Sequence, residues 1–380
     1  MDLNWRRDVD RWRAAGVIDA ETAARIQAFE QSRAGSTRLR WPILIALAFG
    51  AVMIAGGILL FVAANWDALS PASRFGLVLL LVSIFHVAGA VAAEPFPAMS
   101  QALHGIGTVA LGAGIALSGQ IFNLEEHWPG GIMLWAAGAA LAWAVLRHTA
   151  QLALVAVLVP AWLMGEWMLA IEDRARLGII GVGHAAEVAT SGALLLALTY
   201  LSAVAADKAT RSRRMLMWIG GVGGAMAAVV FAGVNMGSPN DPRPDLTLLW
   251  IAGWTIAFAA PLLLAAALRG RDAWTNAIAA VWVGAMVFVP GLDRGVATFG
   301  WWALGAVGLI AWGVRDGRVE RINLGAAGFA VTVLAFYFSR VMDKLGRSAA
   351  LLILGLLFLG GGWALERMRR QLVARTREDR

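Results

Sequence analysis

Residues 41–63 read WPILIALAFGAVMIAGGILLFVA, a stretch that contains no charged side chain. The hydrocarbon core of a bilayer is about 30 Å thick, and a helix needs about 20 consecutive apolar residues to cross it. The stretch is too long for the apolar part of a signal peptide, so we expect it to remain as a membrane-spanning helix. Similar segments follow as far as Glu366, and only short charged gaps separate them.

This pattern predicts an all-α, polytopic integral membrane helix bundle in contact with the lipid bilayer. Hydrophobic residues make up 59% of the chain, whereas soluble domains have about 45–50% apolar residues. We expect a helical hairpin in residues 1–38, a bundle of about twelve spans in residues 39–366 and a basic tail in residues 367–380. The spans are predicted near residues 41–63, 75–93, 103–121, 131–146, 151–171, 188–206, 215–236, 246–268, 273–290, 296–314, 322–339 and 348–365.

The distribution of basic residues predicts the orientation of these spans. With twelve spans, 24 of the 32 Lys and Arg residues fall on the side of both termini and eight on the other side. Cytoplasmic segments carry such an excess, so we expect both termini in the cytoplasm and the chain in the bacterial cytoplasmic (inner) membrane. The net charge of +7 is then a feature of topology, and we expect no nucleic-acid partner. The chain has no Cys, which excludes disulfides and thiolate-bound metals.

Tryptophan is abundant, with 18 residues, and indole rings prefer the headgroup level of a membrane. We therefore predict an aromatic belt formed by residues at the starts of spans: Trp41, Trp135, Trp218, Trp250, Trp274, Trp301 and Trp302.

The first 35 residues predict two cytoplasmic helices, one over Leu3–Ala15 and one that ends near Ser32. Gly16 suits the left-handed conformation that ends a helix, and Asp19 suits the N-cap of the next one. A hairpin of this size has too small a core to be stable alone. We expect it to dock on the membrane domain, on a second copy of the chain or on a partner protein. The residues expected to share its small apolar face are Trp12, Val17, Ile18, Ile26 and Phe29.

Two ionisable side chains fall inside predicted spans. Glu166 lies in the outer third of the span over residues 151–171, and intramembrane acids are usually interior and functional. The alternative is that Glu166 lies close enough to the surface to reach water. His86 lies near mid-membrane, where a neutral ring bonded to a carbonyl is favoured over a proton relay.

Two prolines interrupt predicted spans. Pro160 and Pro261 lack an N–H, so the carbonyls of Ala156 and Ala257 lose their helical partners. Broken helices line the binding sites of many transporters, although proline is also common in membrane helices in general.

Polar side chains gather where the first, third and fifth spans end. These spans run in the same direction, so we expect their ends to form one water-accessible site at the outer leaflet. The candidate binding residues are Asn65, Asp67, Gln120, Asn123 and Glu166. Glu125, Glu126 and His127 are adjacent in a loop and lack the spacing of metal ligands. We interpret these three residues as a solvated loop, and we expect no metal site and no cofactor.

Three strings resemble a bacterial family of predicted membrane proteins, domain of unknown function 2157. They are Trp12-x-x-x-Gly-Val-Ile-Asp-x-Glu-x-Ala23, Ala63-Ala-Asn-Trp66 and Gly119-Gln-Ile-Phe-Asn123. The first is similar to that family's cytoplasmic hairpin, and the other two are similar to its first-span and third-span exits. The resemblance covers about the first 170 residues. It implies the topology described above and brings no activity with it.

Three functions are compatible with these features. The chain binds or transports a small solute or lipid-linked molecule through the outer-leaflet site, or it is a membrane sensor or scaffold that acts through residues 1–35, or it is an intramembrane enzyme that acts on an envelope substrate. Twelve spans, two prolines and both termini inside favour the first function. No complete catalytic motif is present in the sequence, and we therefore do not favour the enzyme; its catalytic residues would be unknown.

The predicted orientation can be tested with a single cysteine, because the native chain has none. A cysteine at Ser36 is expected to stay unlabelled when intact cells are treated with a thiol reagent that cannot cross membranes, and to react after the cells are opened. Labelling in intact cells would contradict a cytoplasmic N-terminus.

Overall fold

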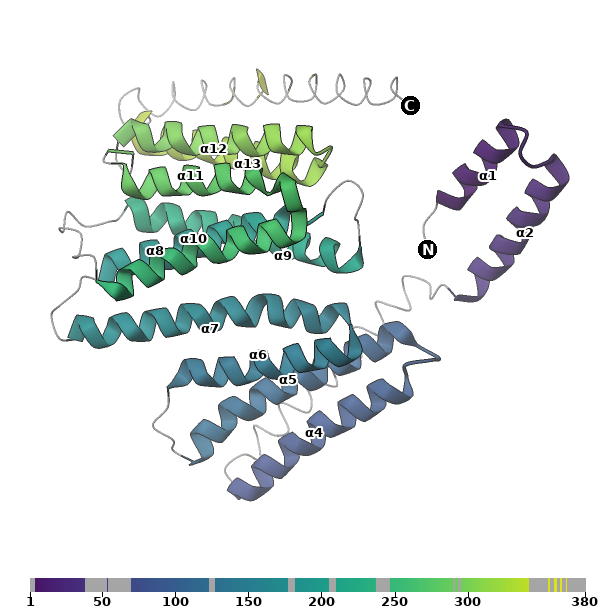
Figure 1. The fold of residues 1–380 in the computed structure, drawn as a ribbon, viewed down its shortest axis with the longest axis horizontal. Helices are drawn as coiled ribbons and strands as arrows, with labels where there is room; N and C mark the ends of the chain where they lie inside the picture. Colours follow the sequence, from purple (N-terminus) through teal and green to yellow (C-terminus); the bar gives the residue numbers. More distant parts are fainter. Residues whose placement is uncertain are drawn as a thin grey trace. The chain divides into compact units, whose positions relative to one another are not determined.

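The computed structural model describes residues 4–37, 70–122, 127–176, 182–204, 210–236, 247–289, 291–292 and 295–341, and the single positions 53, 355, 359, 360, 363 and 367. All elements in these residues are helical, as predicted (Figure 1). Two helices form an N-terminal hairpin, α1 (Asn4–Ala14) and α2 (Ala20–Thr37). The others are α4 (Pro71–Val91), α5 (Pro97–Phe122), α6 (Trp128–Leu146), α7 (Thr149–Arg176), α8 (Val182–Leu201), α9 (Arg211–Met236), α10 (Leu248–Arg269), the short η2 (Gly270–Ala273), α11 (Trp274–Phe288), α12 (Gly295–Arg315), α13 (Val319–Phe336) and the π-helical η3 (Tyr337–Val341). The chain divides into two compact units, residues 1–74 and 75–380.

The local signals of the N-terminal hairpin are confirmed. Gly16 has a left-handed φ of +69° between the two helices, and the Asp19 carboxylate accepts a hydrogen bond of 2.7 Å from the backbone N–H of Thr22. Its buried apolar residues differ from those expected, because Val9 and Ala23 are buried whereas Val17 and Phe29 are exposed. The hairpin therefore leaves apolar side chains uncovered, and its docking stays a prediction.

Nine stretches of the described residues are long and apolar enough to cross a membrane. One of them, Leu248–Phe288, contains both α10 and α11, so each predicted span between residues 75 and 339 corresponds to one helix. The predicted spans over residues 41–63 and 348–365 lie almost wholly outside the described residues, and the total of twelve is not confirmed. The largest changes in a boundary are at α5 and α8, which begin at Pro97 and Val182 and not near residues 103 and 188.

Helices α10 and α11 form a tight hairpin. Gly270 ends α10 with a positive φ of 61°, and the 3₁₀ turn η2 reverses the chain. Phe258 then faces Gly284, and the rings of Trp254 and Phe288 lie 4.8 Å apart. These contacts are those of antiparallel neighbours, so the two helices count as two crossings.

Helix α8 is the central helix of the second unit. About two thirds (67%) of its most apolar window is buried inside the protein, the largest share among the candidate spans. It packs against α7, α9, α10 and α11. Its contact with α9 is close because Gly220 has no side chain: a Cβ atom there would lie 2.2 Å from the backbone nitrogen of Leu201. Small residues allow this close approach of backbones in membrane bundles.

Helices α12 and α13 approach each other in the same way. A Cβ atom on Gly325 would lie 2.8 Å from the carbonyl oxygen of Ala306, and one on Gly313 would lie 2.8 Å from the backbone nitrogen of Ile322. Both helices lie side by side in Figure 1. Each of the pairs α8–α9 and α12–α13 is therefore joined by a seam of glycines.

Apolar side chains cover the outward faces of the peripheral helices. On α9 the exposed residues are Trp218, Val222, Met226, Val229 and Val230, which recur at helical spacing along one face. Such exposed apolar stripes are what a bilayer requires, since lipid replaces water as the solvent.

The two interrupted helices contact α8 at their breaks, and a polar partner compensates for the first break. Tyr200 of α8 donates a hydrogen bond of 3.1 Å to the carbonyl of Ala156, the group that Pro160 leaves unpaired. At the second break, a Cβ atom on Gly192 would lie 3.2 Å from the Cα atom of Ala257, so α8 packs against α10 there. Both prolines thus face the central helix.

The tryptophans of the predicted belt differ in their exposure, and the belt itself stays a prediction. Trp218 and Trp274 are exposed, as residues at a membrane surface should be. Trp250 is buried, and the indole of Trp135 donates to the carbonyl of Thr108 at 2.8 Å. Trp301 and Trp282 exchange hydrogen bonds of 3.1 and 3.0 Å between α12 and α11. These indoles join helices, because a helix carbonyl inside the bundle is an available acceptor.

The bond between Tyr200 and the Ala156 carbonyl predicts a specific coupling. Tyr200→Phe leaves a buried carbonyl unpaired and is expected to lower the free energy of unfolding by about 1–3 kcal/mol. Pro160→Ala restores an N–H that can bond the same carbonyl, so the cost of Tyr200→Phe should nearly vanish in the double variant. Unfolding in detergent micelles measures all four proteins. An equal cost of Tyr200→Phe with Pro160 and with Ala at that position would contradict the coupling.

Candidate functional site

The residues predicted to form the outer-leaflet site are only partly described. Asn65, Asp67 and Asn123 lie outside the described residues. Gln120 is in the last turns of α5, and its side chain is not described. Glu166 is described in full and lies near the end of α7. The convergence of the five residues therefore stays a prediction.

Glu166 is held by two donors at this end of α7. Its Oε2 atom lies 2.6 Å from Nε2 of His127, the residue that precedes α6. Its Oε1 atom accepts a hydrogen bond of 2.8 Å from the indole of Trp162, one turn earlier on α7. The side chain of Glu166 is one-third exposed (33%) and that of His127 is 57% exposed. His127, expected in a solvated loop, is thus exposed and also binds the carboxylate.

An aromatic ring covers the residue that precedes Glu166. A Cβ atom on Gly165 would lie 2.8 Å from the ring of Trp128, so the ring of this first residue of α6 covers the position next to Glu166. We call the end of the second unit where α6 begins and α7 ends the carboxylate end. Its described polar core consists of Glu166, His127 and Trp162.

His86 contacts a second histidine. Its Nδ1 atom lies 2.9 Å from Nδ1 of His104 on α5. The ring of His104 also lies next to that of His148, with 5.4 Å between ring centres. The neutral histidine bonded to a carbonyl, favoured from the sequence, stays a prediction for the Nε2 atom of His86.

A buried acid at the start of α8 was missed by the sequence reasoning. Glu187 and His184 are both buried, and Oε1 of Glu187 lies 3.3 Å from Nδ1 of His184. The predicted span began after Glu187, which assigned this residue to a loop. The signal that could have found the pair is their spacing of three residues, which puts both side chains on one face of a helix.

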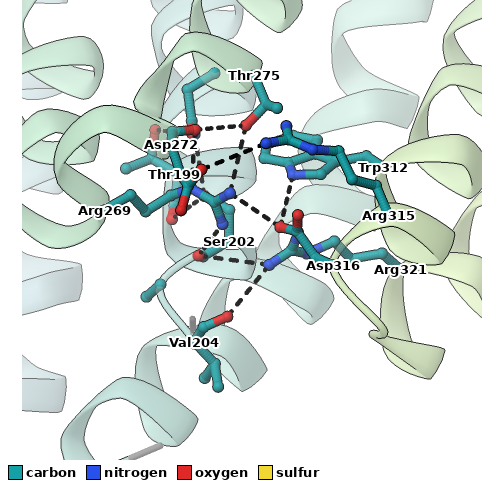
Figure 2. Close-up of polar contacts among 12 residues, drawn as sticks. Thr199, Ser202, Val204, Arg269, Asp272, Thr275, Trp312, Arg315, Asp316 and Arg321 are labelled. Carbon is teal, nitrogen blue, oxygen red and sulfur yellow. Dashed lines mark hydrogen bonds and ion pairs between the residues drawn. The ribbon is translucent and has the colours of Figure 1, made fainter. Parts of the chain in front are cut away.

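A buried network of arginines was also missed (Figure 2). Arg269 ends α10 and Arg321 lies in the first turn of α13, and their side chains are 2% and 1% exposed. Both guanidinium groups bind one oxygen of Asp316, at 2.9 Å and 2.5 Å respectively. Asp316 directly follows α12, so one carboxylate ties together the ends of three helices.

The same arginines bind the backbone at the end of α8. Arg269 donates to the carbonyl of Ser202 at 2.8 Å, and Arg321 donates to the carbonyl of Val204 at 3.4 Å. Arg213 donates to the neighbouring carbonyl of Ala203 at 2.9 Å. The C-terminal carbonyls of a helix lack helical donors and carry partial negative charge, so cations are favourable there. We call this end of the second unit, where α8 ends, the arginine end.

Aromatic rings complete the arginine network. The guanidinium groups of Arg269 and Arg321 lie 5.4 and 4.9 Å from the ring centre of Trp312, within the range of cation–π attraction. The indole N–H of Trp312 donates to Asp316 at 3.1 Å. Figure 2 shows the carboxylate between the two arginines and this ring. Some of the arginines that contribute to the predicted topology are therefore buried and have a structural role.

Electrostatics keep the shared carboxylate ionised. Burial raises the pKa of Asp316, but the hydrogen bonds and charges of Arg321 and Arg269 outweigh burial and hold the pKa below its usual value of 3.8. The pKa in the folded state therefore lies below that in the unfolded state. The stability from this group is complete above the unfolded-state pKa and is lost as the pH falls through the folded-state pKa.

The two polar ends differ in what they can do. Within the described ranges, no group of three or more His, Asp or Glu residues has the geometry to hold a metal ion. The arginine network is buried and internally paired, which suits a structural role. The carboxylate end is exposed to solvent and therefore offers the better binding site.

Replacement of the shared carboxylate should be costly. Asp316→Asn leaves two buried guanidinium groups without their anion and is expected to lower the free energy of unfolding at pH 7 by about 3–5 kcal/mol. The control is Asp272→Asn, because Asp272 forms an exposed pair of 3.4 Å with Arg315 and should cost about 1 kcal/mol or less. The difference between wild type and Asp316→Asn should shrink as the pH falls below about 3.8. Equal costs for both substitutions would contradict the role of Asp316.

The comparisons with known proteins concern the N-terminal part of the chain. Neither the curated proteins nor the solved structures contain a match to this chain. Residues 10–152 match the family described as predicted membrane protein (DUF2157). This range includes part of the N-terminal hairpin, helices α4 to α6 and the start of α7. The N-terminal part of the chain is therefore similar to the predicted membrane proteins of DUF2157, as the three sequence strings implied.

Proposed function

We propose that the protein binds or transports a small solute or lipid-linked molecule through a site at the carboxylate end, built around Glu166. The observation that carries this proposal is the exposed carboxylate, with its oxygens bonded to His127 and Trp162 at 2.6 and 2.8 Å. An exposed ion pair contributes only about 0–1 kcal/mol to stability. Stability alone is therefore a weak reason for an acid at this place in a membrane protein.

The chemistry around Glu166 favours a ligand with an ammonium group or several hydroxyl groups. A carboxylate attracts a cation and accepts hydrogen bonds from hydroxyls. The indole rings of Trp128 and Trp162 add faces that attract organic cations. Trp128 is about half exposed (51%), so a ligand can reach its ring from solvent or from the lipid headgroups.

The position of the site is compatible with transport. Helix α7 carries Glu166 near one end and Pro160 six residues before it, and the break at Pro160 faces the central helix through Tyr200. Broken helices near binding residues are a feature of many transporters. Under the predicted topology, the carboxylate end lies at the outer leaflet, where a lipid-linked molecule would present its headgroup.

The test compares Glu166→Gln with Glu172→Gln in lipid nanodiscs. Glu172 lies six residues further along α7 and is exposed, so it serves as the matched control. The probes are choline, ethanolamine and glucose, and the readouts are the change in Tm and the set of lipids that co-purify. We expect at least one probe or lipid to bind wild type and Glu172→Gln, and to lose about tenfold or more in affinity, about 1.4 kcal/mol, in Glu166→Gln.

Two results would count against the proposal. One is that none of the probes or co-purified lipids binds wild type. The other is that Glu166→Gln binds them as tightly as the control does.

A further inference from the structure

Three of the five histidines of the chain lie together at the arginine end. His86 is on α4, His104 is on α5, and His148 lies between α6 and α7. The ring centres are 5.2 Å apart for His86 and His104, and 5.4 Å apart for His104 and His148. Three separate segments of the chain thus bring imidazole rings into contact, inside a protein that has few ionisable groups in its spans.

Glycines make room for the first two rings. A Cβ atom on Gly107 of α5 would lie 2.9 Å from the ring of His86, and one on Gly89 of α4 would lie 2.9 Å from the ring of His104. Each ring therefore rests on a glycine of the opposite helix. This reciprocal arrangement holds the two Nδ1 atoms at 2.9 Å and fixes the distance between α4 and α5.

Three buried polar atoms around His104 have no hydrogen-bond partner among the described residues. They are Nδ1 of His148, Oε1 of Gln151 and Oγ of Ser100. Gln151 is fully buried, and its Nε2 atom donates to the carbonyl of His104 at 3.0 Å. Ser100 precedes His104 by one helical turn. A buried polar atom without a hydrogen-bond partner lowers stability by about 1–3 kcal/mol. The neutral cluster therefore has unused acceptor atoms that can bind further N–H groups.

No charged side chain is among the described contacts of the three rings. On α4 and α5 the rings face each other and the two glycines, and Gln151 of α7 donates to the backbone carbonyl of His104. The nearest charged residues along these segments are Glu94, which is exposed in the turn after α4, and Arg147, whose guanidinium lies 5.2 Å from the ring centre of Trp143. The net charge of the cluster therefore depends on how many of the three imidazole rings are protonated.

The short Nδ1–Nδ1 distance limits the number of protons. In the neutral pair, one ring donates its Nδ1–H to the Nδ1 lone pair of the other ring, and the donor ring keeps a lone pair on Nε2. A proton that binds to this Nε2 atom leaves the Nδ1 bond intact and makes it charge-assisted, which strengthens it. A second proton would place N–H groups on both Nδ1 atoms and add a like charge, so the rings would have to separate.

We propose that His86, His104 and His148 form a proton-binding site that takes up one proton as a unit and resists a second one. The proton binds to Nε2 of the ring that donates in the His86–His104 bond, and the buried Nδ1 of His148 and Oε1 of Gln151 are acceptors for N–H groups of the charged pair. The second proton separates α4 from α5, because the rings are held between these helices by Gly89 and Gly107. The ligand is the proton itself, supplied from water at the arginine end.

This site is distinct from the carboxylate at the other end of the bundle. His148 directly precedes α7, and Glu166 lies 18 positions later in this helix, which corresponds to about 27 Å along a helix. The proton site does not depend on the function proposed for Glu166, and either can fail without the other.

Ring-specific ¹⁵N-histidine NMR in nanodiscs tests the proposal, because five histidines give five sets of signals. Single His→Gln variants assign them, and His127 and His184 serve as internal references. We expect the signals of His86 and His104 to follow the same two titration steps, separated by more than about one pH unit. In His104→Gln, His86 should titrate in a single step.

Gly107→Ala separates this coupling from a loss of fold. The added Cβ atom would lie 2.9 Å from the His86 ring and should displace it, whereas in the control Gly105→Ala the added atom meets Ala150 at an ordinary 3.5 Å. We expect Gly107→Ala to convert the shared steps into independent single steps, and Gly105→Ala to leave them unchanged. The proposal is wrong if His86 and His104 titrate independently in wild type, if neither takes up a proton between pH 8 and pH 4, or if both alanine variants titrate like wild type.

Discussion

One carboxylate, that of Asp316, joins the ends of α10, α12 and α13. Two guanidinium groups with almost no exposed surface share it, and they also bind the backbone carbonyls of Ser202 and Val204, which directly follow α8. Charges in such a place are tolerated only when every partner is present, because desolvation costs several kcal/mol for each ion. The position of each helix end is therefore conditional on the others. In a bilayer, lipid and protein offer similar surroundings to a leucine, so apolar side chains alone do little to fix how the helices are arranged. In this bundle the shared ion pairs fix the positions of the helix ends.

Helix α8 takes part in close contacts with α7, α9 and α10. The seam at Gly220 brings α9 into backbone contact with it, Tyr200 joins it to the interrupted helix α7, and Gly192 lets α10 approach. In membranes, packing and interhelical hydrogen bonds drive association in place of the hydrophobic effect. Two of these contacts depend on the absence of a side chain and the third on one phenolic hydroxyl. Small changes at these positions are thus expected to matter more than large ones on the lipid-facing stripe of α9.

Local features were predictable from the sequence, and distant partners were not. Gly16 and Asp19 act within a few residues of themselves, so their roles follow from the local pattern and are confirmed. The spans follow from length and hydropathy alone. The partner of the Ala156 carbonyl is 44 residues away and that of Arg269 is 47 residues away. No spacing rule links such positions, and the arginines were accordingly interpreted as markers of orientation. For the candidate site, the sequence indicated Glu166 as a polar group of interest but not its bond to His127.

The glycine seams have a consequence for the order of assembly. Helices α8 and α9, and likewise α12 and α13, are neighbours in sequence and meet in backbone contact, so each pair can close as soon as its two helices are in the bilayer. Contacts between sequence neighbours form fastest because little chain entropy is lost. The bonds of Arg321 to Ser202 and Val204 span 119 and 117 residues and must wait for both pairs. Until both pairs have formed, Arg321 and its acceptor carbonyls stay apart. A chain whose synthesis stopped after α9 would therefore contain a complete α8–α9 hairpin, in which the carbonyls of Ser202 and Val204 still lack Arg321 as a donor.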